Sequence, residues 1–184
     1  MDIKTYFISP IEQQYLALKG DRLFALAHFI LQNNKNYIKF FKNNSKKYWI
    51  TLDSGVAEGS RVPVKEFMKC AKKINATEII CPDELLNSKR TVELTQSFIY
   101  QLSKSDIKRF KFMMVPQGKT LKQFVKCLKT LQDMPECSCI GISKFDVPII
   151  FGKKTDIHIV CDSRKRLIKY LIKNKLITKP IHCL

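Results

Sequence analysis

The chain has 184 residues, 45% of them hydrophobic, which is enough apolar content for the core of a single domain over residues 1–184. Lys and Arg total 33 against 16 Asp and Glu, so the formal net charge is +17. A surplus of this size favours a polyanionic partner, because each phosphate that is neutralised releases counterions; the alternative is a solvated, Lys-rich surface.

The sequence shows the pattern of neither a signal peptide nor a membrane-spanning helix. The N-terminal MDIKTYFISP lacks the basic and apolar regions of a signal peptide. The longest apolar run, residues 23–31, which we expect to be a helix carrying His28, is too short to span a bilayer. We therefore expect no membrane partner and a cytoplasmic location, in the host cytoplasm if the chain is viral.

Short, nearly continuous apolar runs predict buried strands of the parallel kind, covered on both faces. A first strand is expected at residues 4–8, and five more at 48–52, 78–81, 112–115, 138–142 and 180–184. Helical spacing of apolar residues predicts helices between them, at 37–41, 64–74, 91–102, 121–131 and 166–175. Residues 157–160 are expected to be extended, and Asp162 and Ser163 to cap the last helix.

Alternating strands and helices predict a parallel α/β fold. Two architectures fit, a (β/α) barrel and an open doubly wound sheet. The chain contains no G-x-G-x-x-G and no G-x-x-x-x-G-K-[ST] motif, which gives a nucleotide-binding fold of the usual kind little support.

Polar residues follow several of the predicted strands. Asp53 and Ser54 follow the strand at 48–52, Asp83 follows 78–81, and Gln117 and Gly118 follow 112–115. Parallel α/β folds place their sites at these carboxyl ends, although an Asp in such a place can instead be a turn or capping residue. Two carboxylates and a carboxamide suit a purine-like base, since carboxylates accept from N–H groups and an amide both donates and accepts.

The ordered set LDSG, PDE, VPQG and IGIS resembles the transglycosylases that exchange guanine for a 7-deazaguanine in tRNA or, in phages and bacteria, in DNA. The family's tRNA enzymes read DSGGF, an Asp-containing strand end, VQG and a Gly-rich strand end. The resemblance covers residues 48–184 and implies a (β/α)8 TIM-type barrel, of which this chain would hold about six βα units.

The resemblance also implies roles for individual residues. Asp53 matches the Asp of DSGGF, which contacts the base and acts in proton transfer, and Ser54 matches its neighbour. Asp83 and Gln117 match base-reading residues, Gly118 lets backbone approach the base, and Gly141 lines the pocket floor. The implied activity is that of a pentosyltransferase acting on DNA rather than tRNA, with no cofactor and with a 7-deazaguanine base as substrate.

The sequence departs from the family at two points. Gly55, Val56 and Ala57 replace the GGF of DSGGF, so the pocket aromatic is missing. The family's nucleophilic Asp follows the strand that 180–184 resembles. The expectations that follow are a split enzyme or homo-oligomer whose partner chain completes the barrel, a non-catalytic relative that binds a base or nucleic acid, or an activity in which Asp53 takes the nucleophile's place; a tRNA-type relative is a further alternative.

Three clusters of basic residues could contact nucleic acid, or could be solvated surface. We expect no metal site, because Cys137 and Cys139 offer at most two ligands for zinc, and the seven cysteines are interpreted as reduced, buried side chains. The residues predicted to bind nucleic acid are Lys42, Lys46, Lys47, Arg164, Lys165 and Arg166.

Overall fold

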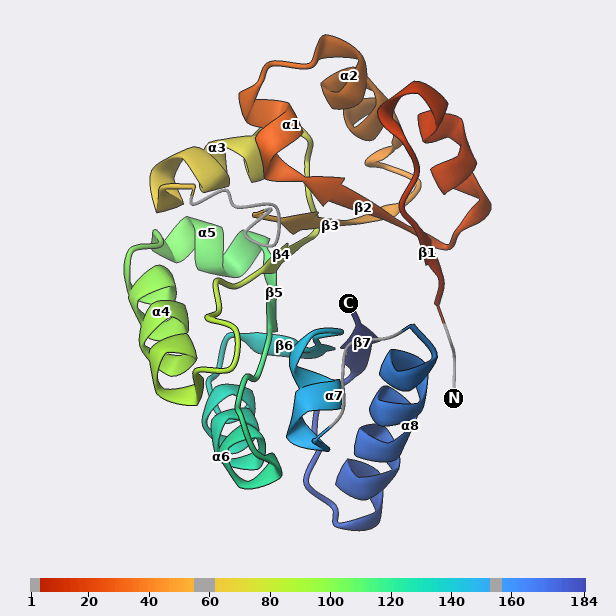
Figure 1. Ribbon diagram of the computed structural model, residues 1–184. Helices are drawn as coiled ribbons and strands as arrows, with labels where there is room; N and C mark the ends of the chain where they lie inside the picture. The colour runs from red at the N-terminus through yellow and green to blue at the C-terminus, as the bar shows by residue number, and fades with distance from the viewer. Residues whose placement is uncertain (1–3, 55–61, 153–156) are drawn as a thin grey trace. The chain divides into compact units, whose positions relative to one another are not determined.

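The computed structural model describes residues 4–54, 62–152 and 157–184. The chain divides into two compact units, one of Met1–Ile80 with Lys108–Phe110 and the other of Cys81–Ile107 with Lys111–Leu184. Each unit contains parallel strands flanked by helices, as Figure 1 shows. The predicted α/β class is therefore confirmed.

The first unit contains four parallel strands, which pair in chain order. They are β1 (Tyr6–Phe7), β2 (Arg22–Leu26), β3 (Trp49–Asp53) and β4 (Glu78–Ile80). The helical segments between them are η1 (Ile11–Lys19), a 3₁₀ helix, followed by α1 (Ala27–Leu31), α2 (Lys35–Asn44) and α3 (Val64–Lys73).

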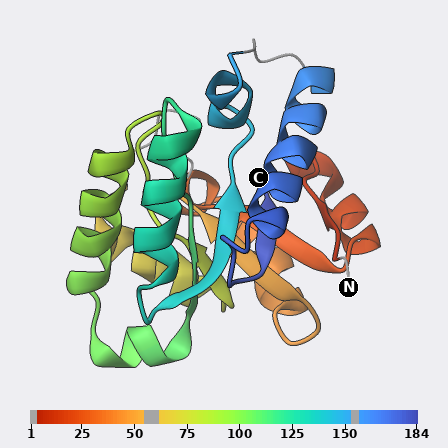
Figure 2. The ribbon, with the colours of Figure 1, turned by 90° about the horizontal axis from the view of Figure 1, so that it is seen from below.

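The second unit contains three parallel strands, also paired in chain order. They are β5 (Lys111–Met114), β6 (Cys137–Ile142) and β7 (Ile181–Cys183). Its helices are α4 (Ser88–Tyr100), α6 (Leu121–Gln132), α7 (Asp146–Ile150) and α8 (Ile157–Lys173), while α5 (Lys104–Arg109) crosses the division of the chain. Helix α4 packs beside α6, and α7 beside α8, as Figures 1 and 2 show.

Strand order bears on the two architectures that the sequence left open. A doubly wound sheet reverses its strand order at a switch point, whereas a barrel keeps it sequential. Among the described strands the order is sequential within each unit, which is consistent with an incomplete α/β barrel. The TIM type and the number of βα units stay predictions.

The core of the second unit forms between β5, β6 and α6. Helix α6 buries side chains at helical spacing along one face, and the neighbouring strands contribute apolar side chains that are fully enclosed. This face is the one that the helical spacing predicts. The largest buried side chains are Phe112, Met113, Met114, Phe124, Leu128, Leu131 and Ile140.

The predicted helix at residues 23–31 is half wrong. Its first half is strand β2, which lies between β1 and β3 and buries Leu23 and Ala25. Only the second half, which carries His28, is helical. A short continuous apolar run is compatible with either structure, and pairing with two neighbouring strands decided the outcome here.

The expectations for residues 157–163 are also wrong. Residues 157–160 begin α8 instead of an extended segment, so Asp162 and Ser163 lie inside the helix and do not cap it. Val160, Leu167 and Leu171 are buried at helical spacing. The β-branched Val160, which precedes the predicted helix, thus belongs to the apolar face of that helix. Packing of that face overrides a weak local preference for strand.

The amino ends of the first unit's strands are joined by a buried hydrogen-bond chain. The Arg22 guanidinium donates to the Tyr6 hydroxyl at 3.2 Å. The Tyr6 hydroxyl in turn lies 3.1 Å from the Thr51 hydroxyl, within hydrogen-bond distance. Thr51 in turn donates to Glu78 at 2.9 Å, and the Trp49 indole N–H lies 3.4 Å from the same carboxylate oxygen. Burial raises the pKa of Glu78, whose side chain is only 2% exposed, while these donors oppose the shift.

We expect Glu78→Ala to destabilise the chain by about 2–4 kcal/mol, because it removes the buried carboxylate that accepts from the Thr51 hydroxyl and the Trp49 indole N–H. Glu78→Gln should cost less, since its amide oxygen still accepts. Urea unfolding measures both variants, with exposed Glu12→Ala as the control. Equal stability of Glu78→Ala and Glu12→Ala would contradict the structural role of the chain of hydrogen bonds.

Candidate functional site

The loop after β4 carries Asp83 and is held from one side by α4. Thr95 donates to the carbonyl oxygen of Pro82 at 3.1 Å. One turn earlier, the Thr91 hydroxyl donates to the Glu84 carbonyl oxygen at 3.1 Å and accepts from the Glu84 N–H at 3.0 Å. Two buried threonines at i and i+4 thus fix the backbone on both sides of Asp83.

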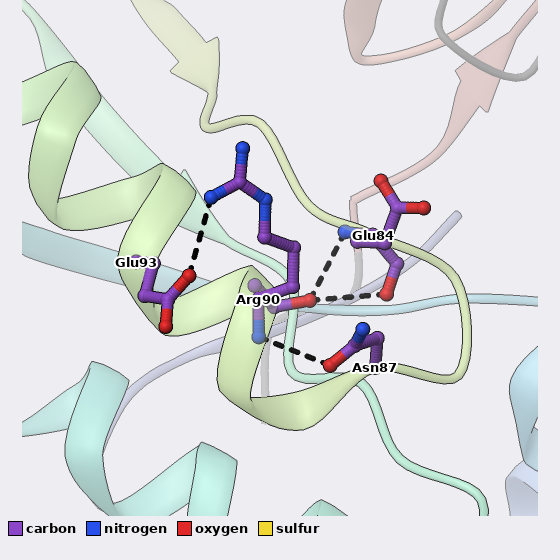
Figure 3. Close-up of polar contacts among 5 residues, drawn as sticks. Glu84, Asn87, Arg90 and Glu93 are labelled. Atoms are coloured by element: carbon purple, nitrogen blue, oxygen red, sulfur yellow. Dashed lines mark hydrogen bonds and ion pairs between the residues drawn. The ribbon is translucent and has the colours of Figure 1, made fainter.

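The end of this loop is fixed by the start of α4. Asn87 is the N-cap, and its side-chain oxygen accepts from the Arg90 N–H at 3.1 Å, as Figure 3 shows. The Arg90 guanidinium pairs with Glu93 at 3.2 Å on the exposed face of the same turn. The cap satisfies a backbone donor that the helix itself leaves unpaired, so the loop ends at a defined residue.

Gln117 holds the same loop from the other side. Its side chain is 1% exposed, and its Nε2 donates to Asp83 Oδ2 at 2.6 Å. Its Oε1 accepts from the Leu86 N–H at 3.2 Å. Leu86 has φ 61°, a left-handed conformation that a bulky residue adopts only when its surroundings impose it. The predicted convergence of Asp83 and Gln117 is therefore observed, with both ends of the amide used to orient the Asp83 loop.

Gly118 follows Gln117 and precedes the first turn of α6. A Cβ at this position would lie 2.6 Å from the backbone nitrogen of Phe124, so no other residue fits without moving the helix. Thr120 caps α6 by accepting from the Gln123 N–H at 3.3 Å. The glycine predicted to let a base approach the backbone is thus the residue that lets α6 approach the strand end.

Asp146 is a residue of this region that the sequence analysis missed. It begins α7, shortly after β6, and is 0% exposed. Neither of its carboxyl oxygens has a hydrogen-bond partner among the described residues. The signal that could have found it is its position, because Asp83 and Gln117 also come three or four residues after a strand end.

Burial and one neighbouring charge shift the pKa of Asp146. Burial is the main cause that raises its pKa to about 8, and the negative charge of Asp83 is the second. The Ser143 hydroxyl and the Val147 N–H lower the pKa in part, although the geometry of neither group meets the criteria for a hydrogen bond to Asp146. With its pKa raised by burial and by the charge of Asp83, the Asp146 carboxyl keeps its proton at a higher pH than an exposed aspartate and can then donate a hydrogen bond.

The thiol nearest to these carboxyls is Cys127 on α6. Burial raises its pKa to about 11, and the charges of Asp146 and Asp83 add to the shift. A neutral, buried thiol is a poor nucleophile. Cys70, Cys81, Cys137 and Cys139 are also buried and form no disulfide bond, as predicted, whereas Cys161 and Cys183 are exposed, contrary to the prediction.

Asp53 and Ser54 belong to the first unit. Asp53 is the last residue of β3, and the Ser54 hydroxyl lies 3.5 Å from Asp53 Oδ1. Gly55, Val56 and Ala57, where the sequence departs from DSGGF, lie outside the described residues. The catalytic role expected of Asp53 and the binding role expected of Ser54 stay predictions.

Gly141 lies inside β6, with apolar surroundings. A Cβ there would lie 2.8 Å from Leu184 Cδ1, 3.1 Å from Val115 Cγ2 and 3.2 Å from Met113 Sδ. The glycine is thus required by packing between β6 and its neighbours. Its expected place on the floor of a pocket stays a prediction.

The residues predicted to contact nucleic acid lie on two helical segments. Lys42, Lys46 and Lys47 are exposed in and after α2, whereas Tyr37 and Phe41 on the same helix are buried in the core. On α8, Lys165 and Arg166 are exposed, and Arg166 stacks on Phe151 with 4.4 Å between its Cζ and the ring centroid. Arg164 is half-buried, and its Nε and Nη2 are buried without a hydrogen-bond partner among the described residues.

The described residues contain no group of three or more His, Cys, Asp and Glu side chains that could hold a metal ion. Within the same residues, no helix combines the length and the apolar content needed to cross a membrane.

Comparison with known proteins adds no family assignment. No protein-family model matches the chain, and no curated protein matches it either. The site is therefore argued from its own residues.

We expect Asp146→Asn to make stability less dependent on pH. An acid with pKa 3.8 when unfolded and about 8 when folded keeps its proton only in the folded state between these values, so stability falls as pH rises from about 4 to 8. Asn carries no charge, so unfolding free energies of the variant and the parent should agree near pH 4 and favour the variant by several kcal/mol near pH 8. Asp133→Asn, an exposed Asp at the end of α6, is the control; parallel pH profiles for all three proteins would contradict the burial of a neutral carboxyl.

Proposed function

We propose that the second unit binds a guanine-like base of a nucleic acid through Asp83, and that the chain acts in the exchange of this base for a 7-deazaguanine. The observation that supports the proposal most is the hydrogen bond of 2.6 Å from Gln117 to Asp83. It holds a half-buried carboxylate at the carboxyl end of a parallel strand, where α/β folds place their sites.

The chemistry of guanine matches such a carboxylate. The base presents a ring N–H beside an exocyclic amine, and a carboxylate accepts from both with its two oxygens. Gln117 donates to Oδ2 of this carboxylate and so orients the group. A neutral Asp146 beside it can donate to a carbonyl or ring nitrogen, which carboxylates alone cannot do.

The partner class follows from charge. A net charge of +17 supports binding to a polyanion, and the exposed lysines and arginines of α2 and α8 are suited to phosphate contacts. A base inside a duplex must be extruded before a side chain can read its hydrogen-bonding edge. Of the two nucleic acids that the family modifies, DNA is the one we propose.

For the exchange step we propose Asp53 as the reacting carboxylate. The glycosidic bond of the outgoing guanine breaks as a carboxylate–C1′ bond forms, and the leaving base takes up a proton. The incoming 7-deazaguanine loses a proton as it displaces the carboxylate, so the net reaction consumes no other reactant.

The binding part is tested with Asp83→Asn. Loss of a charged acceptor that contacts two donors should weaken the binding of deoxyguanosine by about ten- to a hundredfold, measured by calorimetry or NMR titration. Asp133→Asn, the same chemical change at an exposed position, should bind as the parent does. If both variants bind deoxyguanosine equally well, Asp83 does not read the base.

The exchange part is tested by incorporation of a labelled 7-deazaguanine into DNA and into tRNA. The parent protein should label DNA in preference to tRNA, and Asp53→Asn should reduce labelling by a hundredfold or more, as expected when a nucleophile or general base is removed. Preferential labelling of tRNA would reassign the substrate. Base binding without labelling of either nucleic acid would reduce the proposal to a base-binding protein without turnover.

A further inference from the structure

Three neighbouring polar groups of the second unit are buried without hydrogen-bond partners among the described residues. They are both oxygens of Asp146, the hydroxyl of Ser163, and the Nε and Nη2 of Arg164. Native proteins satisfy nearly all such groups, since leaving one unpaired costs about 1–3 kcal/mol and a charged one more. Asp146 begins α7, and Ser163 and Arg164 lie on α8, which packs beside α7, so a ligand that accepts hydrogen bonds there would satisfy these groups together.

The Ser163 hydroxyl lacks the hydrogen bond that a serine inside a helix commonly makes. A serine inside a helix commonly bonds the carbonyl four residues earlier, as Thr130 on α6 does with Lys126 at 3.1 Å. Ser163 is 2% exposed and makes no such bond within the described part of the chain. Its hydroxyl is thus available to a group from outside the helix.

Arg164 offers a particular edge of its guanidinium. Nε and Nη2 are the two nitrogens that together form a bidentate pair with a carboxylate or a phosphate, and both are unpaired among the described residues. The charges that act on the guanidinium belong to Cys183, Cys161 and Asp146. Burial raises the pKa of the Cys183 thiol and of Asp146, so neither supplies a full negative charge at neutral pH.

Asp146 connects this arginine to the base-binding residue. The charge of Asp83 raises the pKa of Asp146, and the charge of Asp146 acts in turn on the pKa of Arg164. No ion pair within 4 Å joins Asp146 and Arg164 in the described residues, so their electrostatic interaction acts over a longer distance. Asp146 is thus within electrostatic range of both Asp83 and Arg164, whose Nε and Nη2 have no hydrogen-bond partner among the described residues.

We propose that Arg164, with the Ser163 hydroxyl and the Asp146 carboxyl group, binds the phosphate of a nucleotide whose base lies at Asp83. All three groups donate hydrogen bonds, and one carries a positive charge, which is the donor set of a phosphate site rather than of a cation site. The ligand of the second unit is then a nucleotide, and the phosphate selects it over a free base. The identity of the base rests on the proposed function, whereas the phosphate site does not.

The experiment compares three probes on the full chain: inorganic phosphate, deoxyguanosine and its 5′-monophosphate. The parent should bind the monophosphate at least tenfold more tightly than the nucleoside. Arg164→Gln should remove that advantage and leave the nucleoside affinity unchanged, and Arg164→Lys should restore only part of it, because an ammonium lacks the bidentate edge. Lys169→Gln, which removes one charge from the exposed face of the same helix, should behave as the parent.

The outcomes separate this proposal from the previous one. Equal affinity of the parent for nucleoside and monophosphate, or an equal effect of Arg164→Gln and Lys169→Gln, overturns the phosphate site. If deoxyguanosine does not bind but inorganic phosphate binds and Arg164→Gln abolishes it, the base proposal fails and the phosphate site stands. Arg164→Gln should also melt no lower than the parent, since it removes an unpaired buried cation; a clearly lower melting temperature would assign Arg164 to structure instead.

Discussion

The hydrogen bond from Gln117 to Asp83 is the interaction on which the candidate site depends. It joins the polar residues that follow β4 and β5, and the other end of the same amide holds the Leu86 N–H in a conformation that leucine rarely adopts. With Thr91 and Thr95 bound to the backbone on either side of Asp83, the loop has few ways to move. A carboxylate held in this way loses little conformational entropy when a ligand binds.

Two groups of polar side chains differ in how their hydrogen bonds are satisfied. At the amino ends of β1 to β4, the side chains of Arg22, Tyr6, Thr51 and Glu78 pass hydrogen bonds from one to the next. After β6, in contrast, Asp146 is buried without a partner among the described residues. A satisfied network stabilises a fold, and an unsatisfied group costs stability that only binding recovers. The first pattern is that of a structural element, and the second is that of a site.

The distribution of charge supports a division of labour among the basic residues. Lys165 and Arg166 extend from the exposed face of α8, where a mobile polyanion can reach them, while Arg164 on the neighbouring face has two buried nitrogens. Exposed charges contribute to attraction that salt screens, and a partly buried guanidinium can orient a single phosphate. One helix can therefore supply both general affinity and a specific contact.

The sequence by itself determined the α/β class, the positions of six of the strands and the polar residues after them. These follow from local patterns, since buried parallel strands are short apolar runs and their carboxyl ends carry polar residues. It could not assign residues 23–31 or 157–163, because an apolar run suits a strand or a helix equally until neighbouring elements pack on it. Only the tertiary structure decided that β2 forms, that Gln117 uses its amide on Asp83 and Leu86, and that Asp146 is buried beside Asp83. These outcomes depend on contacts between residues far apart in the chain, and the pKa of a carboxyl depends on burial that no local pattern records.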